Sequence, residues 1–201
     1  MSTSTSLPNP DNSDRDTPSF KAADAILQAG SSAFIAAPAQ KVWETVIDTS
    51  TWPEWNSFVP RVTVYSQPDS DANDTLSPIL QLGTKMTFHA RMDPTSTKPQ
   101  KSTDTGLIVT VFSPPNAETG ATGRIVWAFD PDAATTYSPS LLAVERQHEV
   151  RQVEGGTELR NWENMVGWLA YVVRWMYKKQ LDVNFEMWSV ELKKFLEGEG
   201  N

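Results

Sequence analysis

The chain of 201 residues contains no cysteine, which excludes disulfides, thiolate metal ligands and a thiol nucleophile. It also has no apolar run long enough to span a bilayer. Its first 25 residues contain no apolar run of the length that a secretory signal needs. A chain without cysteine fits a reducing compartment. These absences predict a soluble protein of the cytoplasm.

Positive charge is in deficit as well. Lys plus Arg number 17 against 25 for Asp plus Glu, so the net charge is -8 at pH 7. A chain with this balance repels the phosphates of nucleic acids and of anionic membrane surfaces. We therefore expect no nucleic-acid partner, no anionic membrane partner and no membrane insertion.

The motifs of metal and nucleophile chemistry are missing too. The histidines are His89 and His148, and neither belongs to a His-x-x-x-His pair or has a carboxylate at ligand spacing. The Gly-x-Ser-x-Gly motif and glycine-rich phosphate loops are also absent. We expect no metal, and any chemistry is expected to need no cofactor.

The chain begins with a polar segment. Residues 1–18 are mostly Ser, Thr, Pro, Asn and Asp, a composition that buries too little apolar surface to offset the entropy of ordering it. Residues 1–30 are therefore predicted to be a disordered or loosely attached tail. Residues 31–198 are predicted to form a single domain.

Periodicity then predicts a strand at 31–37 and a helix at 38–48 that starts near Pro38. Alternating or apolar runs separated by loops rich in turn residues predict six more strands, at 58–65, 83–92, 106–112, 123–129, 141–150 and 157–166.

The last element differs from these strands. Residues 168–197 contain neither proline nor glycine and carry large apolar side chains at helical spacing, which predicts a helix of about 28 to 30 residues. A helix of this length needs a wide surface to lie on. The order of elements favours an α+β fold, in which an antiparallel meander sheet curls around the final helix.

The stretch "FIAAPAQKVWETVIDTSTWPEWNSFV" resembles the amino-terminal signature of the START-like, or SRPBCC, superfamily, whose birch-pollen-allergen members show the helix-grip fold. Within it, the polyketide cyclase/dehydrase and coenzyme Q-binding branch is the most similar. The resemblance implies a seven-stranded curved sheet around a long carboxy-terminal helix, two short helices between strands 1 and 2, and a hydrophobic cavity. Members range from carriers to cyclases, so fold alone does not decide function.

The last two predicted strands place a titratable cluster on the cavity side of their hairpin. If Gly155 and Gly156 form a two-residue turn, His148 lies opposite Glu163. If the turn shifts by one residue on each strand, His148 faces Asn161 and Arg146 faces Glu163. Both registers put Arg146, His148, Asn161 and Glu163 on the side of the cavity.

These four residues are the predicted catalytic set. A histidine beside a carboxylate is a general base near neutral pH, and Arg146 and Asn161 are suited to stabilising an enolate. Such a set would support cyclisation or dehydration of a polyketide-like substrate. The alternative is that the pairs across the strands are structural.

A further group of aromatic and methionine side chains is predicted to line the ligand pocket. It includes the "TWPEWNSF" segment, three strands and the start of the last helix. Its members are Trp52, Trp55, Phe58, Met86, Phe88, Trp127, Phe129, Met165, Trp168, Tyr171, Trp175 and Met176.

Three functions remain open from the sequence. The first is a cofactor-independent enzyme of the cyclase, dehydratase or isomerase type that acts on a small hydrophobic, aromatic or polyketide-like metabolite. The second is a carrier with the same cavity and no chemistry, and the third is a module that binds a partner. The polar cluster favours the enzyme. The oligomeric state, monomer or dimer, stays open.

Overall fold

Strand β1 (Leu27–Ile35) follows a short 3₁₀ turn, η1 (Ala22–Asp24), and leads into two short helices, α1 (Ala39–Ile47) and α2 (Trp52–Trp55). The computed structural model describes residues 11, 13–68, 70, 75–96, 101–134 and 137–198. The remaining elements are β2 (Val62–Ser66), β3 (Lys85–Ala90), β4 (Thr103–Ser113), β5 (Gly123–Phe129), β6 (Ala143–Val153), β7 (Gly156–Val166) and α3 (Leu169–Glu197).

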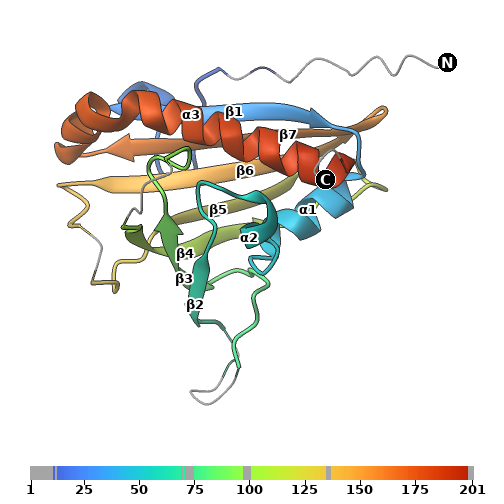
Figure 1. The fold of residues 1–201 in the computed structure, drawn as a ribbon, viewed down its shortest axis with the longest axis horizontal. Coiled ribbons are helices and arrows are strands. Elements are labelled where there is room, and N and C mark those ends of the chain that lie inside the picture. The colour runs from blue at the N-terminus through green and yellow to red at the C-terminus, as the bar shows by residue number, and fades with distance from the viewer. Residues whose placement is uncertain are drawn as a thin grey trace.

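The seven strands form one antiparallel sheet in the order β1-β7-β6-β5-β4-β3-β2. Strands β2 to β7 are a meander, and β1 pairs with β7 at one edge. Figure 1 shows α3 lying along the curved sheet, with α1 and α2 gathered near its carboxyl end. The predicted α+β helix-grip architecture is confirmed, including the two short helices between β1 and β2.

Helix α3 packs through an apolar stripe in its second half, where Phe185, Trp188 and Leu192 are buried. It runs for 29 residues to Glu197 and is capped by Gly198, whose φ of 75° is the left-handed conformation that favours glycine. Within the described part of the chain, no helix combines the length and apolar character needed to cross a membrane.

The amino-terminal boundary differs from the expectation. Strand β1 begins at Leu27, so the boundary expected at residue 31 falls inside a strand. The alternation that was missed is visible in burial, because Leu27 and Ala29 are buried while Gln28 and Gly30 are less so. Leu27 pairs with Met165 of β7, and the pairing continues to the end of β1.

Part of the expected tail also contacts the outer face of the sheet. The backbone carbonyl of Arg15 accepts hydrogen bonds from the side chains of Gln28 and Asn164, and that of Asp16 accepts one from the Trp162 indole. Ser19 donates from its backbone N–H and its hydroxyl to the buried carboxylate of Glu145. Residues 1–10 and 12 of the expected tail lie outside the described residues.

Removal of residues 1–19 is therefore expected to destabilise the fold. It leaves the Asn164 Nδ2 and the Glu145 carboxylate without the partners that residues 15–19 supply, at about 2 to 4 kcal/mol in total. A variant lacking only residues 1–10 keeps these contacts and is the control. Urea unfolding measures both, and equal stability of the two truncated proteins would contradict a structural role for residues 11–19.

Candidate functional site

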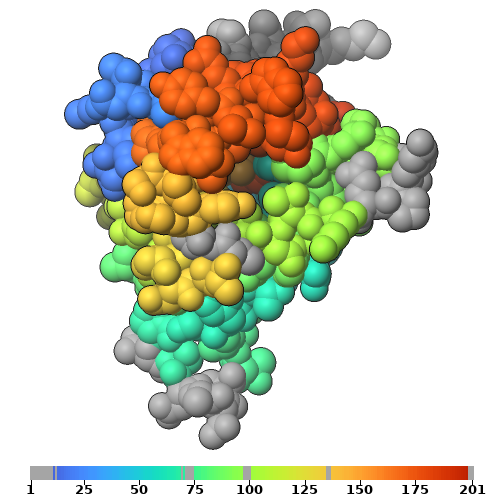
Figure 2. All heavy atoms as spheres, turned by 90° about the vertical axis from the view of Figure 1, so that its left-hand side faces the viewer, coloured from blue at the N-terminus to red at the C-terminus, as the bar shows by residue number. Residues whose placement is uncertain are grey.

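A cavity of about 430 Å³ lies between the concave face of the sheet and α3. Figure 2 shows its mouth as a hollow between the first turns of α3 in orange, the segment before β6 in yellow and a green segment near the start of β4. Its wall is mostly apolar and includes Phe58, Val59, Phe88, Ala90, Met92, Leu107, Trp127, Phe129, Leu142, Val144, Met165, Leu169, Val172, Val173 and Leu181.

The polar part of the wall comes mainly from the β6–β7 hairpin. Val153 pairs with Gly156, so the two turn residues are Glu154 and Gly155, and Gly155 has the positive φ of 79°. The register built on a Gly155–Gly156 turn is wrong, and the shifted register is confirmed. Arg146 faces Glu163, and His148 faces Asn161.

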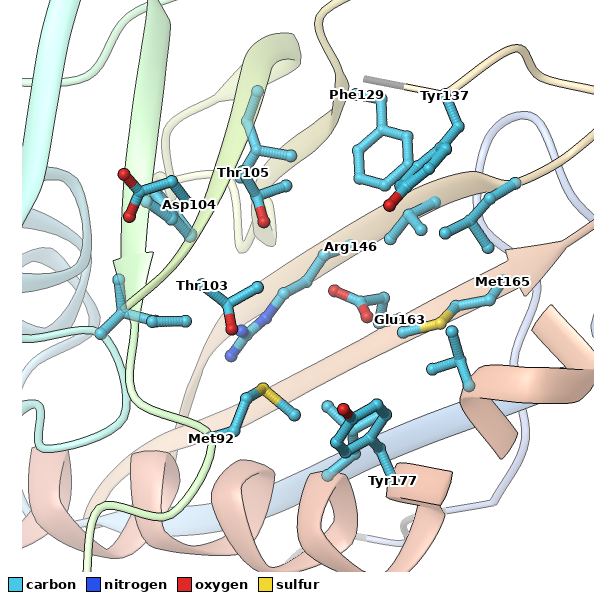
Figure 3. A pocket seen from close by; sticks show the side chains of 18 of the residues that line it. Met92, Thr103, Asp104, Thr105, Phe129, Tyr137, Arg146, Glu163, Met165 and Tyr177 are labelled. Atoms are coloured by element: carbon cyan, nitrogen blue, oxygen red, sulfur yellow. The ribbon is translucent and has the colours of Figure 1, made fainter. Parts of the chain in front are cut away.

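Arg146 reaches into the cavity from β6, and Glu163 does so from the neighbouring strand β7 (Figure 3). Only 3% of Arg146 is exposed, and its Nη2 donates to Asn161 Oδ1 at 3.0 Å. The guanidinium carbon lies 4.2 Å from the centre of the Phe185 ring and 5.5 Å from that of Trp188. Its Nε is buried and has no hydrogen-bond partner among the described residues.

Burial of Arg146 lowers its pKa to about 10, and the attraction of Glu163 opposes part of that shift. The side chain is therefore still a cation at pH 7. A buried guanidinium whose Nε–H has no partner is suited to hold an acceptor or an anion supplied by a ligand.

Glu163 is the acidic member of the pair. Burial raises the pKa of its carboxyl, and the positive charge of Arg146 opposes the shift. Among the described residues, no hydrogen bond or ion pair is found for this carboxylate, and it borders the cavity. A carboxyl group with a raised pKa in an apolar cavity can exchange a proton with a ligand.

His148 does not occupy the position expected for a catalytic base. It is fully buried between Trp127 and Trp188, at ring-centre distances of 4.5 and 4.7 Å. Burial, together with the charge of Arg146, holds its pKa well below 6.5, so the ring is neutral at pH 7. Neither ring nitrogen has a partner among the described residues, and the expected pairing across the strands with Glu163 is not formed.

Asn161 joins the cluster to two other elements. Its Oδ1 accepts from Arg146, while its Nδ2 donates to Ser31 of β1 at 2.7 Å and to Ser189 of α3 at 2.9 Å. The two hydroxyl oxygens are 2.6 Å apart. Asn161 thus positions the guanidinium and ties β1, β7 and α3 together. Ser31 and Ser189 were missed in the sequence because small polar residues carry little signal within an apolar stripe.

The predicted ligand-binding residues divide into three groups. Phe58, Phe88, Trp127, Phe129 and Met165 line the cavity, as expected. Three others are buried but belong to the core: Trp52 packs on Phe88 and Trp127, Trp55 packs on Trp188, and Met86 is fully buried beside them.

The third group lies outside the cavity, and for this group the expectation does not hold. Trp168, Tyr171, Trp175 and Met176 are all more than half exposed, because the first turns of α3 point their other face inward. The inward face carries Leu169, Val173, Tyr177 and Leu181, which repeat every four residues, but the outward aromatic residues fit a helical period equally well.

Several residues of the cavity wall lay outside the predicted set. Besides the inward face of α3, they include Met92, Thr103, Asp104, Thr105 and Tyr137, which border the mouth from loops and strand ends. Loop residues carry no periodicity, so the sequence offers no signal for them. Within the described residues, no group of three or more His, Asp or Glu side chains is arranged to hold a metal ion.

Comparison with known proteins gives a family match. The family model described as "Polyketide cyclase / dehydrase and lipid transport" matches residues 35–136. The chain is 40% identical over 194 residues to "Oxopyrrolidines biosynthesis cluster protein O" of Penicillium oxalicum, covering 92% of this chain and 94% of that protein.

Solved structures support the fold. A hypothetical protein of Helicobacter pylori superimposes with a TM-score of 0.68 at 14% identity, covering 94% of this chain and 99% of that chain. A START superfamily protein of Mycobacterium smegmatis gives a TM-score of 0.57 at 14% identity, covering 86% and 98%. At these identities the likeness shows the fold, and the START-like resemblance of the sequence is confirmed.

The buried imidazole of His148 is expected to make stability depend on pH. Because the pKa of His148 in the folded protein is lowered, the unfolded chain binds this proton more readily. Burial of the neutral His148 ring therefore carries no penalty above about pH 6.5. Below that pH the free energy of unfolding falls, by up to about 1.4 kcal/mol for each pH unit. Urea unfolding at about pH 5, 6 and 8 measures the slope.

His148→Phe is expected to remove this part of the slope. The raised pKa of Glu163 acts in the opposite direction, since the folded protein binds that proton more readily, but it acts in both proteins. The difference between wild type and variant therefore isolates the imidazole. Parallel stability curves for the two proteins would show that His148 is not buried as a neutral ring.

Proposed function

Because the chain belongs to the polyketide cyclase/dehydrase and lipid transport family, we propose that it binds a small hydrophobic metabolite in its cavity and catalyses its cofactor-free cyclisation, dehydration or isomerisation. The observation that carries the proposal is the pairing of Arg146 and Glu163 on one wall of an otherwise apolar cavity. General acid–base catalysis needs a proton carrier and a stabiliser of developing negative charge.

In this proposal Glu163 is the base, in place of His148. Its carboxylate takes a proton from a carbon beside a ligand carbonyl, and the guanidinium of Arg146 stabilises the enolate oxygen. The protonated Glu163 then returns the proton, either to the alkoxide formed by ring closure or to a hydroxyl that leaves as water. The raised pKa of the Glu163 carboxyl supports both directions of transfer near neutral pH.

Asn161 is proposed to act as a positioning residue. Through Ser31 and Ser189 it holds the Arg146 guanidinium at one place on the wall, so the charge needs no reorganisation when the enolate forms. His148, neutral and packed between two indoles, shapes the inner end of the site.

The name of the Penicillium oxalicum relative suggests a class of ligand. An oxopyrrolidine carries at least one ring carbonyl, and a pyrrolidine-2,4-dione carries two, with an acidic C–H bond at the carbon between them. We propose a ligand of this kind, with a carbonyl head at Arg146 and Glu163. An apolar remainder would lie along Phe88, Phe129 and Met165.

Carriage of the ligand without chemistry is the second candidate. It is favoured by the apolar character of most of the wall, which would retain a hydrophobic ligand without catalysis. The two candidates differ in what Glu163 does, because in a carrier its carboxyl only orients the ligand.

Glu163→Gln is expected to lower turnover by about 10²- to 10⁴-fold, because the amide cannot exchange the proton. The variant keeps size and shape, so binding of a pyrrolidine-2,4-dione with an apolar side chain, followed by tryptophan fluorescence, is expected to be nearly unchanged. Turnover is measured by mass spectrometry on linear β-ketoamides as trial substrates. Glu158→Gln, on the outward face of the same strand, is the control.

The results separate the candidates. Binding without turnover in the wild type would establish a carrier and reject catalysis. Turnover by Glu163→Gln at the rate of the wild type would reject this carboxyl as the base. Absence of binding would reject the ligand class.

Replacing Arg146 is expected to shift the pH profile upward. The charge of Arg146 lowers the pKa of Glu163, so Arg146→Met raises that pKa further. Because the carboxylate is the base, kcat/KM rises with pH, and its midpoint is expected at higher pH in the variant. Carboxyl NMR of Glu163 reports the same shift if turnover is lost. Arg151→Met, whose side chain pairs with Glu158 on the outer face, should leave the midpoint unchanged.

A further inference from the structure

The first turns of α3 expose a set of aromatic side chains that the proposed chemistry does not use. Trp175 is 85% exposed, Tyr171 62%, Trp168 58% and Met176 54%. Isolated apolar residues are normal on a surface, but a cluster of this size on two to three turns of one helix indicates a contact surface.

Positive charges share the same turns. Arg174, Lys178 and Lys179 lie among the aromatic residues, and residues 164–181 contain no Asp or Glu. Arg174 donates to a backbone carbonyl, and Lys178 pairs with Asp182. Lys179 has no hydrogen bond or ion pair among the described residues. The aromatic–basic face is defined here as Trp168, Tyr171, Arg174, Trp175, Met176, Lys178 and Lys179, six of which border a surface hollow.

This face adjoins the mouth of the cavity. The turns of α3 that expose the aromatic–basic face also supply Leu169, Val172 and Tyr177 to the cavity wall. Val172 and Tyr177 are themselves partly exposed. In Figure 2 the orange start of α3 forms the upper rim of the hollow. A surface that binds this face would therefore sit beside the opening.

We propose that the aromatic–basic face docks the protein peripherally on an anionic lipid bilayer, with the cavity mouth beside the membrane. Tryptophan and tyrosine rings favour the interfacial region of a bilayer, and lysine and arginine are attracted to anionic head groups. An apolar ligand partitions into the same region, so docking there would bring the mouth to its ligand. The proposal does not depend on whether the cavity performs chemistry.

The basic residues of this face explain how a protein with a negative net charge can bind an anionic bilayer. A chain at -8 repels an anionic surface at long range, but within a Debye length of about 8 Å the first turns of α3 carry three cations, Arg174, Lys178 and Lys179, against the one anion Asp182 that pairs with Lys178. The expectation of no anionic membrane partner follows from the sum of the charges, and vesicle binding tests it against their distribution.

A second copy of the chain fits this face less well. A twofold contact centred on Trp175 would place Arg174, Lys178 and Lys179 of one copy near the same residues of the other. Like charges brought together in this way oppose association. An anionic bilayer meets both the aromatic and the basic parts of the face.

The test is cosedimentation of the full chain with vesicles of phosphatidylcholine alone and with about 30% phosphatidylserine. We expect binding to the anionic vesicles at least about tenfold stronger than to the neutral ones, and weaker binding as salt is raised to about 0.5 M. Trp175→Ala and the double variant Lys178→Glu/Lys179→Glu are each expected to reduce binding by about tenfold.

Matched controls lie elsewhere on the molecule. Lys41→Glu/Lys194→Glu makes the same change in net charge on α1 and near the carboxyl end of α3, and both positions are exposed. Leu82→Ala shortens an apolar side chain in the β2–β3 connection that is also more than half exposed. Both controls are expected to bind anionic vesicles as the wild type does, and circular dichroism checks that every variant is folded.

Three outcomes would overturn the proposal. One is failure of the wild type to bind the anionic vesicles. Another is equal loss of binding in the Lys41/Lys194 control, which would show that only net charge matters. The third is self-association, measured by light scattering, that depends on Trp175 while vesicle binding is absent, since the face would then join two copies or a protein partner.

Discussion

The guanidinium of Arg146 is a charge kept inside the molecule, and the arrangement of three elements depends on keeping it there. A buried cation is tolerated only with hydrogen bonds and polarisable neighbours. Asn161 of β7 accepts from it, Ser31 of β1 and Ser189 of α3 fix that amide, and Phe185 of α3 lies against its face. These groups meet only if the sheet curls until its inner face touches the helix. The long helix and the curved sheet thus supply a polar centre as well as an apolar core.

The same charge sets the protonation of its neighbours. Arg146 adds to burial in lowering the pKa of His148, and it opposes burial at Glu163, where the pKa is raised less than the apolar wall alone would cause. Burial and the charge of Arg146 together therefore keep the imidazole neutral, and the same charge favours ionisation of the carboxyl. This division of roles follows from the register: Arg146 and Glu163 face each other, whereas His148 lies two residues further along β6, between two indoles.

Sequence periodicity predicted the strand faces and the long helix of this arrangement. The alternation in β6 and β7 placed Arg146, His148, Asn161 and Glu163 on one face, and the absence of proline and glycine predicted the length of α3. The register of the β6–β7 hairpin depends on which residues form its turn, and the "EGG" sequence allows two turns that differ by one residue. The prediction that the aromatic residues of α3 line the cavity was wrong for a related reason. Trp168, Tyr171 and Trp175 satisfy a helical period, but a period does not say which face of the helix is turned inward. Side chains on loops, such as Tyr137, carry no periodic signal at all.

The retention of a charge in the cavity bears on the choice between enzyme and carrier. An apolar pair of similar volume at 146 and 163 would serve stability as well as the charged pair does or better, since burying an ion such as the Arg146 guanidinium costs several kcal/mol. A carrier of a purely hydrophobic ligand would gain nothing from that cost. The charged pair therefore has to be explained by the ligand, either by a polar head that must be oriented or by a charge that develops during reaction. Glu163 makes no hydrogen bond or ion pair among the described residues, and its carboxyl borders the cavity. A carboxyl that borders the cavity beside a fixed cation is open to a ligand, which both the proposed proton transfer and the orientation of a polar head need.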